Sequence, residues 1–344
     1  MQSLESHGTR QVNVTRTNIV QDVLEFHKLE HNVQWGVTFH YVGEQGVDVN
    51  GITRDVFTLF WRQARYRFLE GNDNSFVPRT TGLTREEYVL IGRILSYGYV
   101  TAGIFPSFMN RAFMQALLCG EDSLGDDDLI KGILDFLSVY ERERLLRVTS
   151  SNHLAPEDRD FMLDFADRGG VTLNPTQGNV KDIVIEVARA ILVNVPMHTM
   201  LKIKEGMLQI PGCDRIWSDM KVEDLHILYN ELLPSPEKVA AILSAACKNQ
   251  EEERVFSFLR RYTRSLSQES SVKFLRWVTG SETLTVPNIQ VEFHRSTEED
   301  PYPRAHVCAG MLDISSKGYE TYNKFRRIMD AVICNEEAFT FSSA

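Results

Sequence analysis

The chain has 344 residues, of which 43% are hydrophobic, so it can bury a substantial core divided among two or more units. Its formal net charge of −10 argues against a surface for nucleic-acid phosphates, which requires a basic footprint. The first residues are too polar for a secretory leader, and no apolar run approaches membrane-spanning length. We therefore expect a protein of the cytoplasm or nucleus that binds neither nucleic acid nor membrane.

The cysteines argue against a metal site and against a disulfide framework. There are five of them, at positions 119, 213, 247, 308 and 334, and no two have the close spacing of zinc ligands. An odd number of cysteines is typical of a reducing compartment. We expect no metal and no cofactor.

Helical and strand patterns alternate in the N-terminal part. Apolar residues with helical spacing predict a helix over 19–29, and the alternation in 35–41 predicts a strand. A glycine-rich turn at 43–46 separates this strand from a second helix over 56–68. Thr84 and Glu87 have the spacing of a capping box, which predicts the start of the next helix.

The middle of the chain is predicted to be helical throughout. Pro106 is expected to begin a helix that stops at Gly120, and the acidic residues 126–128 to begin another. The remaining helices are expected at 156–167, from 180 onward with a kink at Pro196, at 223–233 and at 238–247.

The polar stretch 248–253 is the expected domain boundary. Beyond it the pattern changes to two short helices, strands near 289–293 and 311–314, and a final helix. Charged runs also occur as solvated faces of helices, and composition by itself does not separate the two interpretations.

Cys308 has the strongest local signs of a reactive thiol. It lies in PRAHVCAG (303–310), where prolines and Gly310 predict an exposed turn. Arg304 and His306 bring cationic or protonatable groups near the sulfur, and in an extended stretch His306 and Cys308 point to the same side. Cationic neighbours favour the nucleophilic thiolate.

Two other interpretations of the cysteines remain open. A cysteine beside a short apolar run is also typical of a small buried hydrophobic residue, and for Cys119 and Cys334 core packing is a sufficient explanation. A cysteine protease would require a histidine that acts as a base and an oxyanion hole. The nine histidines are scattered, and no spacing singles one out.

The order of motifs resembles that of the HECT catalytic domain over nearly the whole chain. The similar N-terminal segments are VNVTR (12–16), GEQGVD (43–48), GITRDVF (51–57) and IGRIL (91–95). The C-terminal third is more similar, with FLRWVTGS (274–281), PRAHVC (303–308), Leu312, Asp313 and Tyr319 in register, and Phe341 as the fourth residue from the end.

This resemblance implies an α+β, mainly helical, bilobal fold. The large helical N-lobe would span residues 10–247, with an E2-docking subdomain at about 120–200. Residues 248–253 would form a hinge, and 254–344 a smaller α/β C-lobe that carries the cysteine loop, residues 303–310. The implied partners are an E2 ubiquitin-conjugating enzyme, ubiquitin and a protein substrate.

The resemblance also implies roles for individual residues. Cys308 would accept ubiquitin as a thioester and pass it to a substrate lysine. Arg304 and His306 would tune the thiol and its loop, unless they are only solvated loop side chains. Asp313 would receive the lysine or act as a structural cap, and Phe341 would anchor the C-terminal tail, unless the tail is disordered.

The sequence departs from the family pattern directly around the cysteine. The family usually has threonine before it, where this chain has Val307, and an aromatic residue and asparagine after it, where this chain has Ala309 and Gly310. The usual LPxY is replaced by ISSKGY (314–319), and the E2-docking region is dissimilar. A HECT-like module that binds ubiquitin, E2 or another protein without transfer is therefore the alternative to an active ligase.

Overall fold

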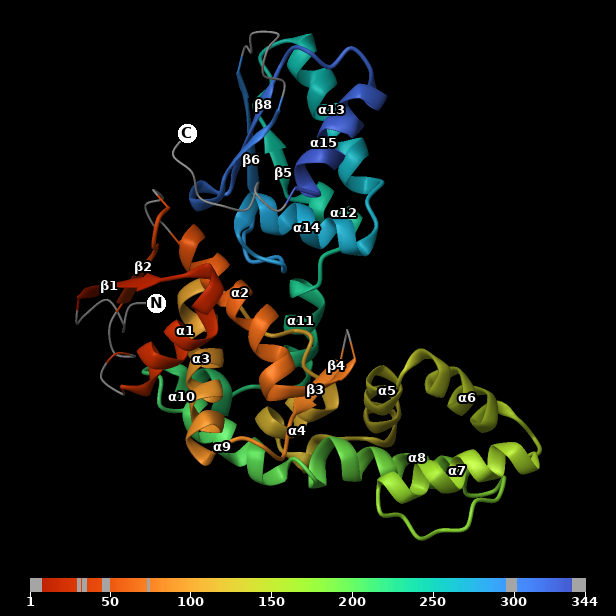
Figure 1. Cartoon of the computed structure of the whole chain (residues 1–344). Helices are drawn as coiled ribbons and strands as arrows, with labels where there is room; N and C mark the ends of the chain where they lie inside the picture. The colour runs from red at the N-terminus through yellow and green to blue at the C-terminus, as the bar shows by residue number, and fades with distance from the viewer. Residues whose placement is uncertain are drawn as a thin grey trace. The chain divides into compact units, whose positions relative to one another are not determined.

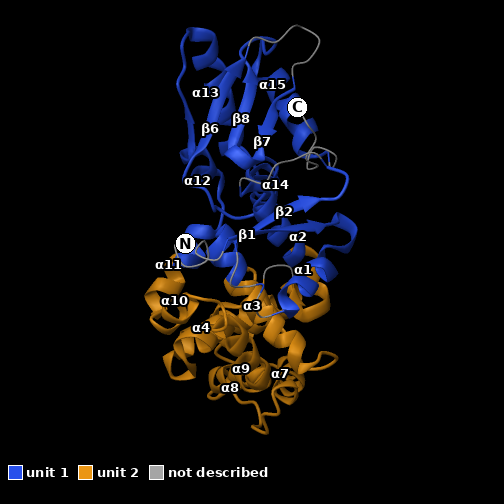
Figure 2. Ribbon diagram, turned by 90° about the vertical axis from the view of Figure 1, so that its left-hand side faces the viewer, with its two compact units in different colours: residues 1–61, 97–105, 228–344 blue, residues 62–96, 106–227 orange. Residues whose placement is uncertain are grey.

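The computed structural model describes residues 8–29, 32, 36–44, 50–72, 75–294 and 302–335. Helices dominate, and three small sheets accompany them, which confirms the predicted mainly helical α+β class (Figure 1). The chain forms two compact units, each built from separate stretches (Figure 2). Unit 1 contains residues 1–61, 97–105 and 228–344, and unit 2 contains residues 62–96 and 106–227.

The N-terminal part of unit 1 consists of a two-stranded parallel sheet and helices that contribute aromatic side chains to its core. Strands β1 (Thr9–Val14) and β2 (Gly36–Tyr41) pair in parallel and are joined through α1 (Ile19–Lys28). Their core contains edge-to-face and tilted ring contacts among Phe26, Phe39, Phe57 and Tyr97, with ring centroids 5.8–6.2 Å apart. Phe57 comes from α2 (Gly51–Phe68) and Tyr97 from α3 (Arg85–Ala102), so this core fixes the start of α2.

The C-terminal part of unit 1 is a four-stranded sheet in the order β5-β6-β8-β7. Its strands are β5 (Leu243–Ala245), β6 (Ile289–His294), β7 (Arg304–His306) and β8 (Met311–Ser315). The helices of this part are α12 (Pro236–Ala241), α13 (Gln250–Arg264), α14 (Gln268–Thr279) and α15 (Tyr322–Ile333). Helix α11 (Val222–Leu232) precedes them and is divided between the two units. Helices α12 to α15 gather on one side of the sheet (Figure 1).

Alternation along these strands separates core from surface. Ile289, Val291, Leu312 and Ile314 are buried and join the cluster that contains apolar residues of α13, α14 and α15. The alternate residues of β6, β7 and β8 are partly or fully exposed, and this face of the sheet is turned to the viewer in Figure 2. The cysteine loop is therefore carried by a strand pair with one buried face.

Unit 2 is a set of packed helices with one β-hairpin. Strands β3 (Leu69–Asn72) and β4 (Ser75–Pro78) pair antiparallel. The helices are α4 (Arg111–Cys119), α5 (Asp126–Phe136), α6 (Val139–Ser150), α7 (Pro156–Arg168), α8 (Val180–Arg189), α9 (Met197–Met207) and α10 (Cys213–Ser218). A π-helical segment (Ala190–Asn194) and Pro196 separate α8 from α9, which confirms the predicted kink.

Several element boundaries differ from the sequence prediction. The helix expected at Pro106 begins at Arg111, because the Asn110 side chain accepts hydrogen bonds from the Ala112 and Phe113 amides. The helix expected over 238–247 ends at Ala241, and 243–245 form β5 because they pair with β6. Helix α6 and the hairpin β3–β4 were not predicted.

The predicted hinge contains regular structure. Asn249 is the N-cap of α13, and residues 250–253 form its first turn, so the first of the two short helices expected after 253 begins earlier than predicted. The division into lobes at 10–247 and 254–344 stays a prediction.

Among the described residues no single helix has the length and apolar composition to cross a membrane. Residues 180–194 and 197–207 meet that requirement only when taken together as a pair bent by 44°.

Candidate functional site

Cys308 lies in a tight turn between two paired strands. Val307–Ala309 form one turn of 3-10 helix between β7 and β8, closed by a 3.2 Å hydrogen bond from the Gly310 amide to the Val307 carbonyl. Gly310 has φ +59°, a left-handed conformation that favours glycine. The Cys308 side chain is partly exposed. The interpretation of Cys308 as a fully buried hydrophobic residue is therefore wrong.

The positions of His306 and Arg304 follow from the hairpin. The extended stretch ends at His306, so the strand alternation predicted for His306 and Cys308 does not reach Cys308, which lies in the 3-10 turn. In the antiparallel register His306 pairs with Met311, and Arg304 pairs with Asp313. Arg304 is exposed and His306 partly buried.

Arg54, in the first turn of α2, connects three distant segments. Its Nε donates to the Thr279 carbonyl at 2.7 Å, and its Nη2 donates to the Val307 carbonyl at 2.9 Å. Thr279 is the last residue of α14, so Arg54 satisfies a carbonyl that the helix itself leaves without a partner. Its positive charge also lies at the negative end of the α14 dipole.

Two glycines allow the main chains to approach closely at this point. A β-carbon on Gly51 would lie 2.6 Å from the Cys308 nitrogen and Cα, a distance that no ordinary contact permits. A β-carbon on Gly280, which has φ +76°, would lie 2.8 Å from the Gly51 carbonyl oxygen and 3.1 Å from Val307 Cγ1. The start of α2, the end of α14 and the cysteine loop therefore meet backbone to backbone.

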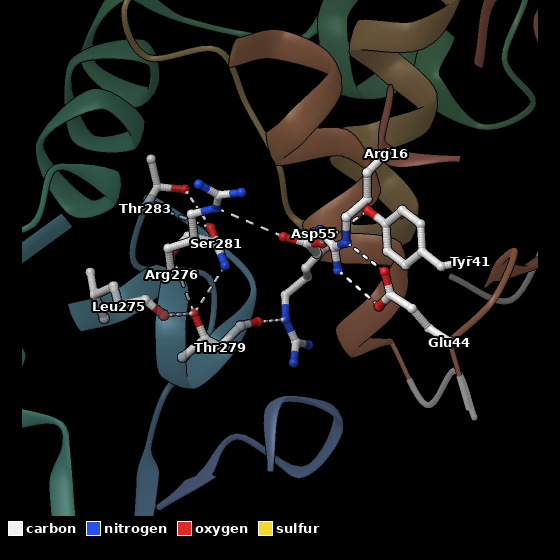
Figure 3. A network of polar contacts seen from close by, with 10 residues as sticks. Arg16, Tyr41, Glu44, Asp55, Leu275, Arg276, Thr279, Ser281 and Thr283 are labelled. Carbon is white, nitrogen blue, oxygen red and sulfur yellow. Dashed lines mark hydrogen bonds and ion pairs between the residues drawn. The ribbon is translucent and has the colours of Figure 1, made fainter. Parts of the chain in front are cut away.

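The neighbouring Asp55 is the centre of a buried charged network (Figure 3). Its Oδ2 accepts hydrogen bonds from Arg16 Nη1 at 2.7 Å and Tyr41 Oη at 2.9 Å. On the other side Arg276 of α14 forms an ion pair with Oδ1 at 3.8 Å. Arg16 also makes a bidentate contact with Glu44, at 2.7 and 3.2 Å.

Burial sets the electrostatics of this network. Burial raises the pKa of Asp55, and the charge of Arg16 opposes that rise. Burial would lower the pKa of Arg16, but the hydrogen bond with Glu44 and the charge of Asp55 hold it above its ordinary value. Burial and the charge of Asp55 raise the pKa of Tyr41, so its hydroxyl remains a donor to Asp55.

The remaining predicted site residues are not gathered at the sulfur by any contact described above. Asp313 lies within β8, away from any helix start, and its Oδ1 is 2.7 Å from His294 Nδ1, so the capping alternative is wrong. Phe341 lies outside the described residues. The roles predicted for Arg304, His306, Asp313 and Phe341 stay predictions.

The other cysteines have surroundings unlike those of Cys308. Cys213 is buried, and burial raises the pKa of its thiol to about 11. Cys334 is exposed just beyond α15, so core packing does not explain it. All five cysteines lie in the described part of the chain, and none of them forms a disulfide there. Across the described ranges, no three His, Cys, Asp or Glu residues are grouped as metal ligands.

Sequence reasoning identified the cysteine loop but missed Arg54, Asp55 and Gly51. All three lie in GITRDVF (51–57), a segment noted only for its resemblance. One signal was available, because an adjacent Arg-Asp pair inside an otherwise apolar helix face requires buried partners. Those partners lie up to 253 positions away, and periodicity gives no information about them.

Comparison with known proteins identifies the family of the chain. The sequence model of the HECT domain, described as a ubiquitin-transferase, matches residues 50–342. This range includes the start of α2, α14 and the cysteine loop, whereas Arg16, Tyr41 and Glu44 precede it. A search of curated proteins found no match. Because the matched range covers most of the chain, the protein belongs to the HECT-domain (ubiquitin-transferase) family.

Proposed function

We propose that this protein is an E3 ubiquitin ligase that accepts ubiquitin from an E2 enzyme onto Cys308 and passes it to a substrate lysine. The observation that carries the proposal is a partly exposed cysteine in a fixed turn of the matched HECT region. Membership of the family implies ubiquitin transfer in general. The choice of Cys308 rests on its loop, because Cys213 is buried and Cys119 and Cys334 lie at the ends of helices α4 and α15.

The proposed reaction has two steps. The Cys308 thiolate attacks the carbonyl carbon of the E2–ubiquitin thioester, a new carbon–sulfur bond forms, and the E2 thiolate leaves. Both sides of this exchange are thioesters, so positioning can supply most of the catalysis. A neutral lysine amine then attacks the same carbon, Cys308 leaves as thiolate, and the amine proton passes to a base or to water.

The altered residues around Cys308 are compatible with an intact turn. Gly310 occupies a left-handed position, where asparagine, the usual family residue, is among the best tolerated of the other amino acids. The replacement therefore keeps the backbone of the turn and removes only an amide group. Loss of this amide and of the hydroxyl at Val307 weakens polarisation of the thioester carbonyl, and we expect slow transfer.

The proposed E2-docking site lies within residues 120–200. Helix α6 exposes Val139, Tyr140 and Leu146, with 67%, 68% and 45% of their surfaces accessible, and α7 exposes Leu163. Exposed apolar side chains on neighbouring helices are typical of interaction sites. We assign this surface to the E2, because the proposed ligase must bind one.

The proposed lobes would have to approach E2 and substrate in turn. Residues 248–253 are the expected hinge, and the described part of that stretch is anchored by Asn249, which accepts from the Glu252 amide at 3.0 Å. Strand β5, just before this stretch, pairs with β6 and belongs to the same four-stranded sheet as the cysteine loop.

A charging assay tests the proposal. The full chain is incubated with E1, a panel of E2 enzymes and ubiquitin, and the products are separated with and without reductant. We expect an adduct that reductant removes and that Cys308→Ala abolishes, while Cys119→Ala retains it. The Cys119 thiol is a suitable control because it lies at the end of α4, where its Sγ contacts the Met220 carbonyl at 3.5 Å.

Two results would overturn the ligase assignment. One is the absence of an adduct with every E2, and the other is an adduct that persists in Cys308→Ala. In the first case retained binding of E2 or ubiquitin would identify the alternative, a HECT-like module that binds without transfer.

A further inference from the structure

The first turn of α2 contacts both sides of the peptide that joins Val307 to Cys308. Arg54 Nη2 donates to the Val307 carbonyl at 2.9 Å. Gly51 lies against the Cys308 nitrogen and Cα, where even one added carbon would be 2.6 Å away. Positions 51 and 54 share one face of the helix, since they are three residues apart.

This contact restrains the reactive residue through planar geometry. The Val307 oxygen and the Cys308 nitrogen and Cα belong to one rigid peptide plane. The same oxygen also accepts the hydrogen bond from the Gly310 amide that closes the turn, because a carbonyl oxygen can accept two hydrogen bonds. Arg54 therefore holds the group that sets both the orientation of Cys308 and the shape of its turn.

Arg54 is itself held in place. It is buried, and its Nε is fixed by the Thr279 carbonyl at 2.7 Å. The next residue, Asp55, is fixed by Arg16 and Tyr41. A guanidinium presents donors in a planar fork, so it can reach two carbonyls at once, which a lysine ammonium on a flexible chain does less well.

We propose that Arg54 is a positioning residue for Cys308, an inference that rests on the proposed ligase function. Through the Val307 carbonyl, Arg54 fixes the thiol in the geometry required for thioester exchange. It does not contact the sulfur or the substrate in this role. The effect of its loss is therefore expected in the rate of the chemical step and not in the affinity for the E2.

Single-turnover charging with increasing concentrations of E2–ubiquitin separates these two quantities. Arg54→Ala should lower the maximal rate by about 10- to 100-fold, since a displacement of about 1 Å can have an effect of this size, and leave the half-saturating concentration unchanged. Arg54→Lys, which keeps a cation and one donor group, should recover part of the rate.

Arg93→Ala is the matched control. Arg93 is similarly buried and donates from Nε to Gln209 within unit 2. Like Arg54→Ala, Arg93→Ala should melt at a lower temperature than wild type, but it should keep the maximal rate. A maximal rate of Arg54→Ala within twofold of wild type overturns the proposal. A faster rate also overturns it, because the contact would then restrain transfer.

Hydrogen exchange of the loop provides a readout that needs no ubiquitin. In Arg54→Ala the Gly310 amide should exchange at least about 10-fold faster than in wild type, while Arg93→Ala leaves it unchanged. Equal exchange in Arg54→Ala and wild type overturns the proposal. If wild type takes no ubiquitin from any E2, the ligase assignment fails, and the exchange result still decides whether Arg54 fixes the cysteine loop.

Discussion

Asp55 and Asp158 each contact two arginines, but in opposite surroundings. Asp55 has 3% of its side chain exposed, and its partners Arg16 and Arg276 come from the two ends of the chain. Asp158 begins α7 with 15% exposed, and its partners Arg144 and Arg147 lie on the preceding helix, at 3.4 and 2.7 Å. The first arrangement joins remote segments at the cysteine loop, whereas the second links neighbouring helices at the surface.

The difference shows which interactions determine the structure of each region. The surface of α6 and α7 depends on local signals, namely the Ser138–Glu141 capping box, Pro156 at a helix start and Gly169 at a helix end. The region around Cys308 depends on long-range contacts of buried charges, which are stable only when every partner is present. Four predictions test this contrast.

Asp55→Ala should have the largest effect. It removes the buried carboxylate that accepts hydrogen bonds from Arg16 and Tyr41. Breaking a buried ion pair lowers the free energy of unfolding by about 3–5 kcal/mol. Chemical denaturation measures the loss in free energy of unfolding. A loss below about 1 kcal/mol would mean that the buried and surface networks are equivalent, and the contrast would be wrong.

Gly51→Ala should be the next most harmful change. Its β-carbon would meet the Cys308 backbone at 2.6 Å, and overpacking of this kind costs about 1–3 kcal/mol. The same denaturation measurement applies, with Gly178→Ala as the control, because a β-carbon there meets nothing within 4 Å. Equal stabilities of the two variants would show that α2 and the cysteine loop do not approach each other.

Ser138→Ala should have a moderate and local effect. Its hydroxyl accepts from the Glu141 amide, and loss of an N-cap costs about 1 kcal/mol. Hydrogen exchange should increase in the first turn of α6 and remain unchanged in the cysteine loop. Ser150→Ala, in the last turn of the same helix, should change hydrogen exchange in neither region. Faster exchange of the cysteine loop in Ser138→Ala would contradict the prediction that the effect stays within α6.

Asp158→Asn should have the smallest effect, under about 1 kcal/mol at neutral pH, because its ion pairs are partly exposed at the surface, where such pairs contribute little. Burial opposes the shift, but hydrogen bonds from Arg147 and Arg144 hold the pKa of Asp158 below its ordinary value. A lowered folded pKa gives stability above the unfolded pKa of about 3.9 that disappears as pH falls through the folded value. Unfolding curves should therefore distinguish wild type from Asp158→Asn at pH 7, and the difference should shrink as the pH falls below about 3.9.

Much of the secondary structure was predictable because its signals are local. The Thr84–Glu87 capping box forms as expected, with reciprocal hydrogen bonds of 2.9 and 3.3 Å, and Gly120 ends α4. Strand β5 could not be predicted, since residues 243–245 become a strand only through pairing with β6. Helix α6 was not predicted because its apolar residues do not form one buried stripe, since Val139, Tyr140 and Leu146 are exposed.

The mainly helical α+β class, the family and the cysteine that we propose to be reactive could be predicted from the sequence. These follow from periodicity, caps and ordered motifs, which are properties of neighbouring residues. That Arg54 binds the Val307 carbonyl and that Gly51 lies against Cys308 became evident only in the folded structure. The physical reason is that main-chain carbonyls and buried ion pairs find partners wherever folding brings them, and spacing along the chain does not record these contacts.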